Sequence, residues 1–294
     1  MTFEQLTIFV AVAERQHLTR AAEDIGLTPS AVSASIKALE TFYNVRLFDR
    51  VGRGIELSPA GRLFLDEAKA TLARANAAEQ VLSELGGLRR GRLTLFASQT
   101  ISSYWLPPRL MQFHQRYPQI ELQVTSANTA EVSQAVLEGA ADLGFIEGEI
   151  DQPALATLPL ALDQMVIVVS ASHPLGTITP RNFAGFLMSS SWIMREKGSG
   201  TRSQFEVALK NFSLNPDDLE IAFTLPSNEA ILSALRDSQC AAALSRLVAD
   251  PYIRSGELRA IEIELPPRTF MAVRHKERTE SPAARELLGV CREV

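Results

Sequence analysis

The sequence predicts a mixed α/β protein in three consecutive parts, and three observations support this architecture. The first sixty residues have the pattern of short helices followed by a hairpin, and residues 59–86 have that of one long helix. From residue 91 onward, short apolar strands alternate with helices, which is typical of α/β domains with largely parallel strands. A chain of 294 residues suits several parts, because one domain usually takes roughly 100–200 residues.

Composition narrows the class of protein. Hydrophobic residues make up 46% of the chain and charged residues 21%, which is the globular range and excludes a disordered or fibrous chain. The apolar runs are strand-sized, whereas a membrane helix needs about 18 consecutive apolar residues, and the N-terminus lacks a secretory leader pattern. We therefore expect a cytoplasmic protein. A net charge of -5 argues against general polyanion binding, but a local basic surface can still bind DNA.

The N-terminal part has the pattern of a helix-turn-helix. Apolar residues recur at helical spacing in a first helix, at Leu6, Phe9, Val10 and Ala13. Thr19 is expected to cap a second helix over residues 20–25, which Gly26 ends. Pro29 is expected to open a third helix, because proline favours the first helical turn. Two helices joined by a tight turn that contains glycine form the helix-turn-helix motif.

The third helix has two contrasting faces. The apolar face consists of Val32, Ile36, Leu39 and Tyr43. The opposite face is small and polar with one cation, and consists of Ser30, Ser33, Ala34, Lys37 and Thr41. A small polar face suits a helix that enters the major groove of DNA. A solvated surface helix is the alternative, although such a helix more often carries long Glu and Lys side chains.

Residues 45–58 alternate in polarity and turn at Gly52-Arg-Gly54, which predicts a hairpin, or wing. Arg50 and Arg53 lie near its tip, where basic side chains can reach phosphates or the minor groove.

Several linked motifs in this region resemble the winged helix-turn-helix of LysR-type transcriptional regulators. They are residues 6–9 (LTIF), 18–22 (LTRAA), 27–33 (LTPSAVS), 36–40 (IKALE), 47–50 (LFDR) and 57–61 (LSPAG). The resemblance implies that DNA faces Thr28, Pro29, Ser30, Ser33, Ala34, Lys37 and Arg53; Thr19 and Arg50 complete the candidate DNA-binding residues. Many family members carry Arg or His where this chain has Ala34. A bidentate base contact is therefore excluded there, and specificity depends on Ser33, Thr28 and DNA shape.

Ser58 and Pro59 are expected to start a linker helix that runs to Gly86-Gly87 and spans roughly 40 Å at about 1.5 Å per residue. Its apolar positions follow a 3-4 spacing. The candidate dimerisation residues are Phe64, Ala68, Ala75, Ala78, Leu82 and Leu85. Packing of this stripe within its own domain is the alternative. We favour dimerisation, as in LysR-type regulators, and expect a homodimer that can pair into a homotetramer.

In the second half, strands are predicted at residues 93–96, 121–125, 142–146, 165–169, 221–225, 241–244 and 269–273. Helices are predicted at residues 106–116, 130–138, 202–212, 228–236 and 282–292. The resemblance adds a two-lobed, periplasmic-binding-protein-like effector domain with a cleft. The expected domains are a winged helix-turn-helix at 1–58, a linker helix at 59–87 and an effector domain at 91–294. Lobe one would hold 91–163 plus 269–294, and lobe two 164–268.

Two loops indicate an effector site in that cleft. Residues 98–103 are expected to follow a strand and precede a helix, and residues 198–202 to do the same in the other lobe. Both segments carry hydroxyl groups, and helix N-termini attract anions. Either loop alone would suggest an ordinary cap, but one in each lobe favours a site. The candidates are Ser98, Thr100, Ser102, Thr129, Glu147, Ser199, Thr201 and Arg202. The resemblance implies inducer contacts from the first three, and we expect Thr201 to close from the opposite lobe.

The first loop resembles those of family members that sense small oxyanions such as sulfate or sulfite, whereas a small carboxylate metabolite is the alternative. The expected partners are double-stranded operator DNA, the inducer and a second copy of the chain, with RNA polymerase as a further candidate. No cofactor, metal or membrane is expected.

Two other classes of protein are disfavoured. An enzyme is improbable, because two cysteines and four histidines show no metal or catalytic spacing and no P-loop or dinucleotide motif occurs. A plain solute-binding protein does not explain the N-terminal motifs.

Overall fold

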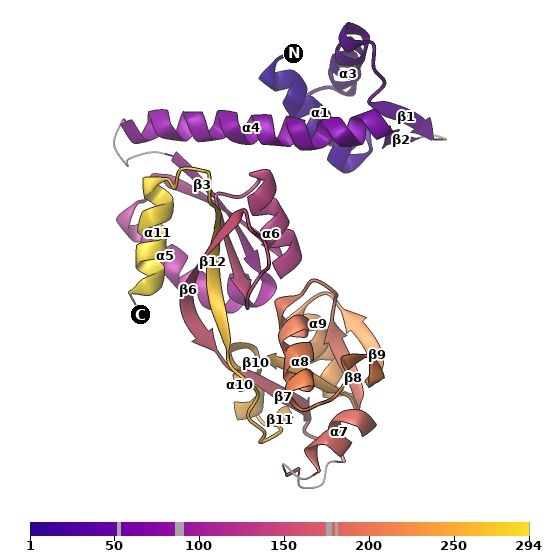
Figure 1. Ribbon diagram of the computed structural model, residues 1–294, viewed down its shortest axis with the longest axis vertical. Coiled ribbons are helices and arrows are strands. Elements are labelled where there is room, and N and C mark those ends of the chain that lie inside the picture. The colour runs from indigo at the N-terminus through magenta and orange to yellow at the C-terminus, as the bar shows by residue number, and fades with distance from the viewer. Residues whose placement is uncertain (52–53, 86–90, 175–177, 180–181, 294) are drawn as a thin grey trace. The chain divides into compact units, whose positions relative to one another are not determined.

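The computed structural model describes residues 1–51, 54–85, 91–174, 178–179 and 182–293, without the side chains of 76–77 and 79–85. Contacts divide the chain into two compact units, essentially residues 1–85 and 86–294 (Figure 1).

The N-terminal unit is a winged helix-turn-helix followed by a long helix. Its elements are α1 (Phe3–Arg15), α2 (Leu18–Asp24), α3 (Pro29–Tyr43), β1 (Phe48–Val51), β2 (Gly54–Leu57) and α4 (Pro59–Leu85). The predicted third helix and linker helix are confirmed. One predicted cap is wrong: α2 starts at Leu18, and the ring of His17, not the hydroxyl of Thr19, accepts a hydrogen bond from the backbone N–H of Arg20.

The core of this unit lies between α1, α3 and the start of α4. It includes Leu6, Phe9, Val12, Val32, Ile36, Leu39, Leu57 and Ala68. Gly26 ends α2 with a φ of +68°, the left-handed region in which glycine is unstrained. Tyr43, predicted on the apolar face, is 49% exposed because α3 ends there.

The C-terminal unit contains two five-stranded sheets. The first has the order β4-β3-β5-β12-β6. Its strands are β3 (Gly91–Ser98), β4 (Ile120–Ala127), β5 (Leu143–Glu147), β6 (Leu155–Asp163) and β12 (Arg268–His275). The helices of this lobe are α5 (Leu106–Arg116), preceded by a π-helical turn at Ile101–Trp105, α6 (Thr129–Glu138) and α11 (Pro282–Arg292).

The second sheet has the order β11-β7-β10-β8-β9. Its strands are β7 (Met165–Ser170), β8 (Ser191–Arg195), β9 (Glu220–Leu225), β10 (Ala241–Ser245) and β11 (Leu258–Ala260). The accompanying helices are α7 (Phe183–Ser189), α8 (Gly200–Asn211), α9 (Asn228–Arg236) and α10 (Arg246–Arg254), with a 3-10 turn at Pro216–Asp218. Trp192, at the centre of its apolar core, is completely buried.

The structure contains every strand and helix predicted in the second half, and adds β6, β8, β11, α7 and α10. The expectation of largely parallel strands is only half correct. The pairs β3–β4, β3–β5, β8–β9 and β8–β10 are parallel, whereas β5–β12, β6–β12, β7–β10 and β7–β11 are antiparallel. Antiparallel strands arise because the chain crosses between the sheets twice, once from β6 into β7 and once from β11 into β12.

Candidate functional site

The recognition helix α3 is fixed by its cap and its buried face. The Thr28 hydroxyl accepts a hydrogen bond from the backbone N–H of Ala31 and lies 3.1 Å from the Ser30 hydroxyl. Pro29 occupies the first turn. The predicted DNA-facing residues of the helix, Ser30, Ser33, Ala34, Lys37 and Thr41, are all exposed. Thr19 on α2 is exposed as well. The unit therefore presents a small, polar helix face to solvent.

The wing is held to α3 by Glu40, which sequence reasoning did not single out. Its carboxylate accepts hydrogen bonds from the backbone N–H groups of Leu47 at 2.7 Å and Phe48 at 3.1 Å. Strand β1 pairs with β2, and Arg50 lies opposite Ile55 with its side chain exposed. Arg53 lies outside the described residues. The Glu40 contacts position the wing beside the recognition helix.

The linker helix uses part of its predicted seam inside its own unit. The rings of Phe64 and Phe9 lie 4.8 Å apart, and Ala68 is buried in the same core. Ala68 is therefore covered by the core of its own unit, whereas Phe64 is only half-buried there, and a role for either residue in a dimer interface stays a prediction. Ala75 is half-buried and Ala78 exposed. Leu82 and Leu85 lie among the residues whose side chains are not described.

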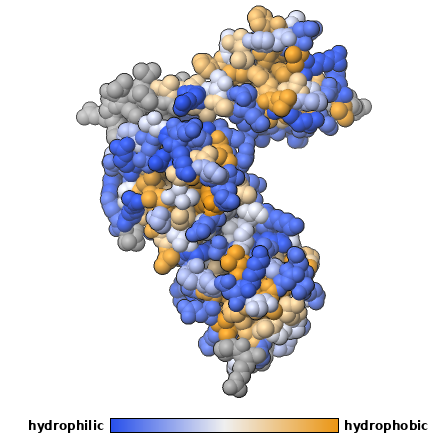
Figure 2. All heavy atoms as spheres, in the orientation of Figure 1, coloured by the Kyte–Doolittle hydropathy of each residue, from blue (hydrophilic) through white to orange (hydrophobic). Residues whose placement is uncertain are grey.

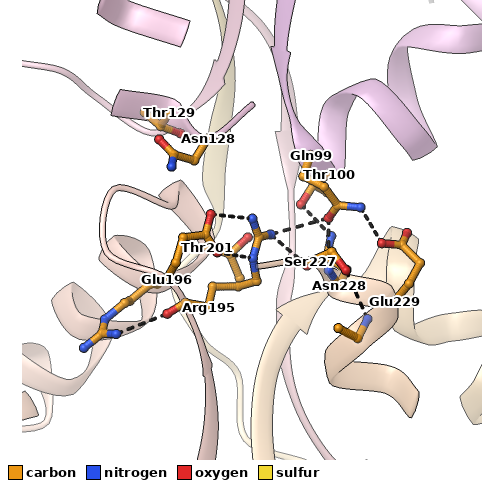
Figure 3. A network of polar contacts seen from close by, with 12 residues as sticks. Gln99, Thr100, Asn128, Thr129, Arg195, Glu196, Thr201, Ser227, Asn228 and Glu229 are labelled. Atoms are coloured by element: carbon orange, nitrogen blue, oxygen red, sulfur yellow. Dashed lines mark hydrogen bonds and ion pairs between the residues drawn. The ribbon is translucent and has the colours of Figure 1, made fainter. Parts of the chain in front are cut away.

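Lobe one and lobe two of the C-terminal unit meet where three strands end (Figure 3). Gln99 and Thr100 follow β3, Arg195 ends β8, and Asn228 follows β9. The Asn228 side-chain amide donates to the Thr100 hydroxyl at 3.1 Å, and its backbone N–H donates to the Gln99 side-chain oxygen at 3.2 Å. Carboxyl ends of parallel strands are the usual ligand sites of α/β folds.

Arg195 is the central charge of this contact, and it is 3% exposed. Its Nε and Nη2 atoms donate to the two carboxylate oxygens of Glu196 at 2.8 and 2.9 Å. Its Nη1 donates to the side-chain oxygens of Asn228 at 3.2 Å and Gln99 at 3.4 Å. The guanidinium thus bonds to both lobes and holds a positive charge in the interior, where only a polar or anionic neighbour can stabilise it.

Glu229 provides a second link between the lobes at this contact. The Gln99 amide donates to it at 2.6 Å, and the Tyr104 hydroxyl donates to it at 2.8 Å. Burial, followed by the bond to Glu229, raises the pKa of Tyr104.

Ser98 directly precedes Gln99 in the chain. Its hydroxyl is buried and has no hydrogen-bond partner in the described part of the chain. Ser102 donates instead to the Gln99 carbonyl and lies 2.8 Å from the Ser126 hydroxyl.

A separate buried contact contains three further candidates, Thr129, Glu147 and Thr201. Arg268, at the start of β12, donates through Nε to Asp163 at 2.7 Å and through Nη1 to the Thr201 hydroxyl at 3.0 Å. The Thr129 hydroxyl donates to Glu147 at 3.1 Å. These residues come from the two strands that cross between the lobes and from the segments packed beside them.

The loop that begins α8 packs tightly at this second contact. A Cβ atom on Gly200 would lie 2.6 Å from the Thr129 hydroxyl, so no larger residue fits there. The Gly198 carbonyl accepts from the backbone N–H of Ala130 at 3.2 Å. Ser199 is buried at the start of α8, and Arg202 pairs with Glu206 at 2.7 Å. The loop thus contacts residues 128–130 and 147, and the contacts of Thr100 and Thr201 fall in two different groups.

No cluster of three His, Cys, Asp or Glu side chains among the described residues could hold a metal ion. Burial raises the pKa of the Cys291 thiol to about 12 despite the nearby Arg109, so the nucleophilic thiolate is disfavoured. None of the described helices is both long and apolar enough to cross a bilayer.

Two family profiles match nearly the whole chain. The profile described as "Bacterial regulatory helix-turn-helix protein, lysR family" matches residues 3–62, and "LysR substrate binding domain" matches residues 86–294. The chain belongs to the LysR family. This LysR-family protein is a DNA-binding transcriptional regulator with an effector-binding domain, and not an enzyme.

Two full-length proteins and one regulatory domain show the extent of the similarity. The uncharacterized HTH-type transcriptional regulator YeiE of Escherichia coli (strain K12) is 33% identical over 99% of this chain and 97% of its own. Full-length CbnR, solved in complex with its target DNA, has a TM-score of 0.70 and 21% identity over 99% of both chains. The CcmR regulatory domain of Synechocystis PCC6803, solved in complex with 2-PG, has a TM-score of 0.61 and 25% identity, covering 70% of this chain and 99% of that one.

Sequence reasoning for this LysR-family chain missed Arg195, Asn228 and Glu229. The signal that singled out Ser98, a polar residue directly after a strand, also applies to Arg195. It was missed because the strand that precedes Arg195, β8, was not predicted. Asn228 and Glu229 open a predicted helix directly after a predicted strand, so the same rule would have found them.

Proposed function

We propose that this LysR-family regulator binds a two-fold symmetric operator as a cytoplasmic homodimer, and that a small anion bound between the lobes changes its operator affinity. The observation that carries the proposal is Arg195, a nearly inaccessible cation that bonds to both lobes where three strands end.

The contacts of Arg195 indicate how an anion could enter. Glu196, its present counter-ion, is 27% exposed, so its carboxylate can turn toward water without being buried unpaired. A ligand anion in its place would keep the guanidinium neutralised and could accept from the free hydroxyl of Ser98. Charge-assisted hydrogen bonds to Arg are about twice as strong as neutral ones. The proposed site therefore comprises Ser98, Gln99, Thr100, Arg195 and Asn228.

This site revises the expected roles of the loop residues. Thr100 remains a site residue, but Thr201 bonds to Arg268 in the second contact and is no longer proposed as a ligand. Thr129 and Glu147 bond to each other in the second contact, and Ser199 is buried at the start of α8. Ser102 and Arg202 donate to the backbone carbonyls of Gln99 and Arg195, so we propose that they support the site rather than bind the ligand. A small oxyanion such as sulfite suits one guanidinium among neutral donors, and a carboxylate is the alternative to be tested. Ligand binding by the related CcmR domain supports an effector at this domain.

Binding of the anion would act by changing the relative populations of an open and a closed arrangement of the two lobes. A ligand shifts such an equilibrium only by its differential affinity for the two states, and a site made of both lobes provides that difference. Contacts between subunits would then change, and with them the spacing of the two recognition helices on the operator.

The proposed DNA surface is the exposed face of α3 together with the wing. CbnR, which shares the fold, was solved in complex with its target DNA. We assign contacts to Thr19, Thr28, Pro29, Ser30, Ser33, Ala34, Lys37, Arg50 and Arg53. Lys37 and Arg50 would mainly contact phosphates.

The proposed dimer surface is the face of the N-terminal unit that its core leaves uncovered. Large apolar side chains are exposed in this unit, among them Leu63 at 77% and Phe42 at 76%. Figure 2 shows hydrophobic residues gathered on the visible face of this unit. Together with Ala75, Ala78, Leu82 and Leu85 they suit a second copy of the chain. Sedimentation of a monomer at micromolar concentration would exclude this part of the proposal.

The site is tested by thermal-shift and calorimetric titration of the full-length protein with sulfite, sulfate and small carboxylates, 2-PG included. We expect one class to bind, and Arg195→Gln to lose that binding by about tenfold or more, since each 1.4 kcal/mol is a factor of ten. Arg116→Gln, which removes an exposed ion pair with Glu293, is the matched control. Equal anion binding by the Arg195 variant and the wild type would overturn the assignment of Arg195 to the site.

A further inference from the structure

A second concave site lies in lobe one, away from the three strand ends just described. It is a groove of about 420 Å³ between α11 and the strands β5, β6 and β12. These four elements belong to the same lobe (Figure 1). Pockets that hold small molecules usually have volumes of about 300–1,000 Å³. The groove is thus large enough for a ligand of moderate size.

The groove combines an apolar floor with a cationic rim. Its apolar lining includes Leu143, Leu158, Ala272, Val273 and Leu288. Its charged lining consists of Arg274, Arg285, Arg292 and Glu280. Three guanidinium groups and one carboxylate give the groove an excess of positive charge, although the net charge of the whole chain is -5. Such a lining complements a molecule with an apolar body and an anionic group.

The arginines are only weakly engaged by the protein itself. Arg285 is paired with Glu280 at 3.6 Å while its side chain remains 68% exposed. Within the described part of the chain, the Arg274 guanidinium donates to a single acceptor, the backbone carbonyl of its neighbour His275, at 3.5 Å. Arg292 forms no ion pair with any described residue, and the adjacent Glu293 is paired with Arg116. Guanidinium donors at the rim therefore remain without an acceptor among the residues that the structure describes.

A glycine in α11 provides an independent observation. Arg285, Leu288, Gly289 and Arg292 recur at helical spacing and all line the groove. Glycine destabilises the interior of a helix relative to alanine. A Cβ atom on Gly289 would meet no atom of the described chain within 4 Å, so packing within the protein does not require glycine there. The missing side chain leaves room for something other than the chain's own atoms.

We propose that this groove is a second ligand site, which binds an amphiphilic anion with its apolar body against α11 and its acidic group at the arginine rim. The proposal is independent of the anion site at Arg195. Either of the two proposed sites can be disproved while the other still holds.

The test uses 1-anilinonaphthalene-8-sulfonate, a fluorescent anion with an apolar ring system, on the full-length protein. Binding should be saturable. Gly289→Leu should weaken it by about tenfold or more because leucine fills the groove, and the double change Arg285→Gln with Arg292→Gln should weaken it similarly. Gly185→Leu is the matched control, because Gly185 is also an exposed helical glycine with open space at its Cβ position, but in α7.

Competition identifies the ligand class. Octanoate should displace the probe, whereas 1-octanol lacks the charge and acetate lacks the apolar body, so both should compete much less. Equal competition by octanol, or a probe signal that Gly289→Leu leaves unchanged, would overturn the proposal. If Gly289→Leu instead changes the oligomeric state in sedimentation, the groove is an interface between copies of the chain and the ligand site is wrong. Probe binding should persist in Arg195→Gln, which separates the two sites.

Discussion

At the scale of single residues, Arg195 and Glu196 form a buried cation with a replaceable counter-ion. Removing one partner of a buried ion pair leaves an unpaired charge, which is strongly destabilising. Here the arginine is 2% exposed in its side chain and the glutamate 27%, so the pair is asymmetric. The glutamate can be released to water, whereas the arginine cannot. In the proposed site an incoming anion would therefore compete with Glu196, and this competition would set the affinity for the anion.

Glu196→Gln should increase the affinity of the effector anion. The amide keeps the size of the side chain but removes the competing charge, so we expect roughly five- to tenfold tighter binding, about 1 kcal/mol. Isothermal titration of the wild type and the variant measures the change. Glu206→Gln is the control, because Glu206 also pairs with an arginine of lobe two. A variant with weaker anion binding than the wild type would show that Glu196 is part of the ligand site.

Thr100→Val should destabilise the protein rather than affect only ligand binding. The family resemblance implied an inducer contact from Thr100, but in the structure its hydroxyl accepts a hydrogen bond from the buried Asn228 amide. Valine leaves that N–H group without an acceptor, which costs about 1–3 kcal/mol. Urea unfolding, followed by a spectroscopic signal of the effector domain, should show a lower midpoint for this variant. Thr224→Val, at an exposed position of β9, should change little, and an unaltered Thr100→Val midpoint would contradict the contact.

At the scale of helices and strands, much of the chain could be predicted from periodicity and capping residues. Pro29 after Thr28 and Pro59 after Ser58 marked the starts of α3 and α4 because both pairs are strong start signals. Strand β6 was missed because Pro159 interrupts it; the structure accommodates the proline at a register shift on a sheet edge. β8 was missed because its five residues include only three consecutive apolar ones, a run too short to separate strand from helix. Arg195 was missed as a site residue for the same reason, because it ends β8.

The wing should depend on Glu40. Glu40→Ala removes the acceptor of two backbone N–H groups, at a cost of about 1–3 kcal/mol, and should loosen β1 relative to α3. We expect weaker DNA binding together with faster amide exchange at Leu47 and Phe48. Glu23→Ala, exposed on α2, is the control. Unchanged exchange at both amides would rule out this role for Glu40.

The lobe contact formed by Tyr104 and Glu229 should weaken at alkaline pH. Burial and the bond to Glu229 raise the pKa of Tyr104 above its ordinary value of 10.0, so the folded protein holds this proton more tightly than the unfolded chain. The corresponding stability is complete below pH 10 and is lost progressively as the pH rises above it. Tyr104→Phe should make stability fall less steeply in this range, as measured by urea unfolding at several pH values. Tyr43→Phe controls for loss of a phenol, and identical slopes for the wild type and Tyr104→Phe would contradict the shift.

At the scale of the whole molecule, the sequence identified the order of its parts, because the N-terminal motifs are local and closely spaced. It could not identify which residues of the effector domain meet. Thr100 contacts Asn228 across 128 positions of the chain, and Arg268 contacts Thr201 across 67. Such pairs follow from the packing of the two sheets rather than from any local pattern. We propose that a ligand bound between the lobes that this packing brings together influences DNA binding.

The most direct measurement of that influence is the operator affinity of the full-length protein with and without the effector anion, using DNA selected from a random pool. If the anion changes the protein's affinity for the operator by a given factor, linkage requires that the operator changes the protein's affinity for the anion by the same factor. We expect a change of about 5- to 150-fold in the wild type, equal in both directions, and little or none in Arg195→Gln. An operator affinity that responds to the anion equally in the wild type and in Arg195→Gln would contradict the account.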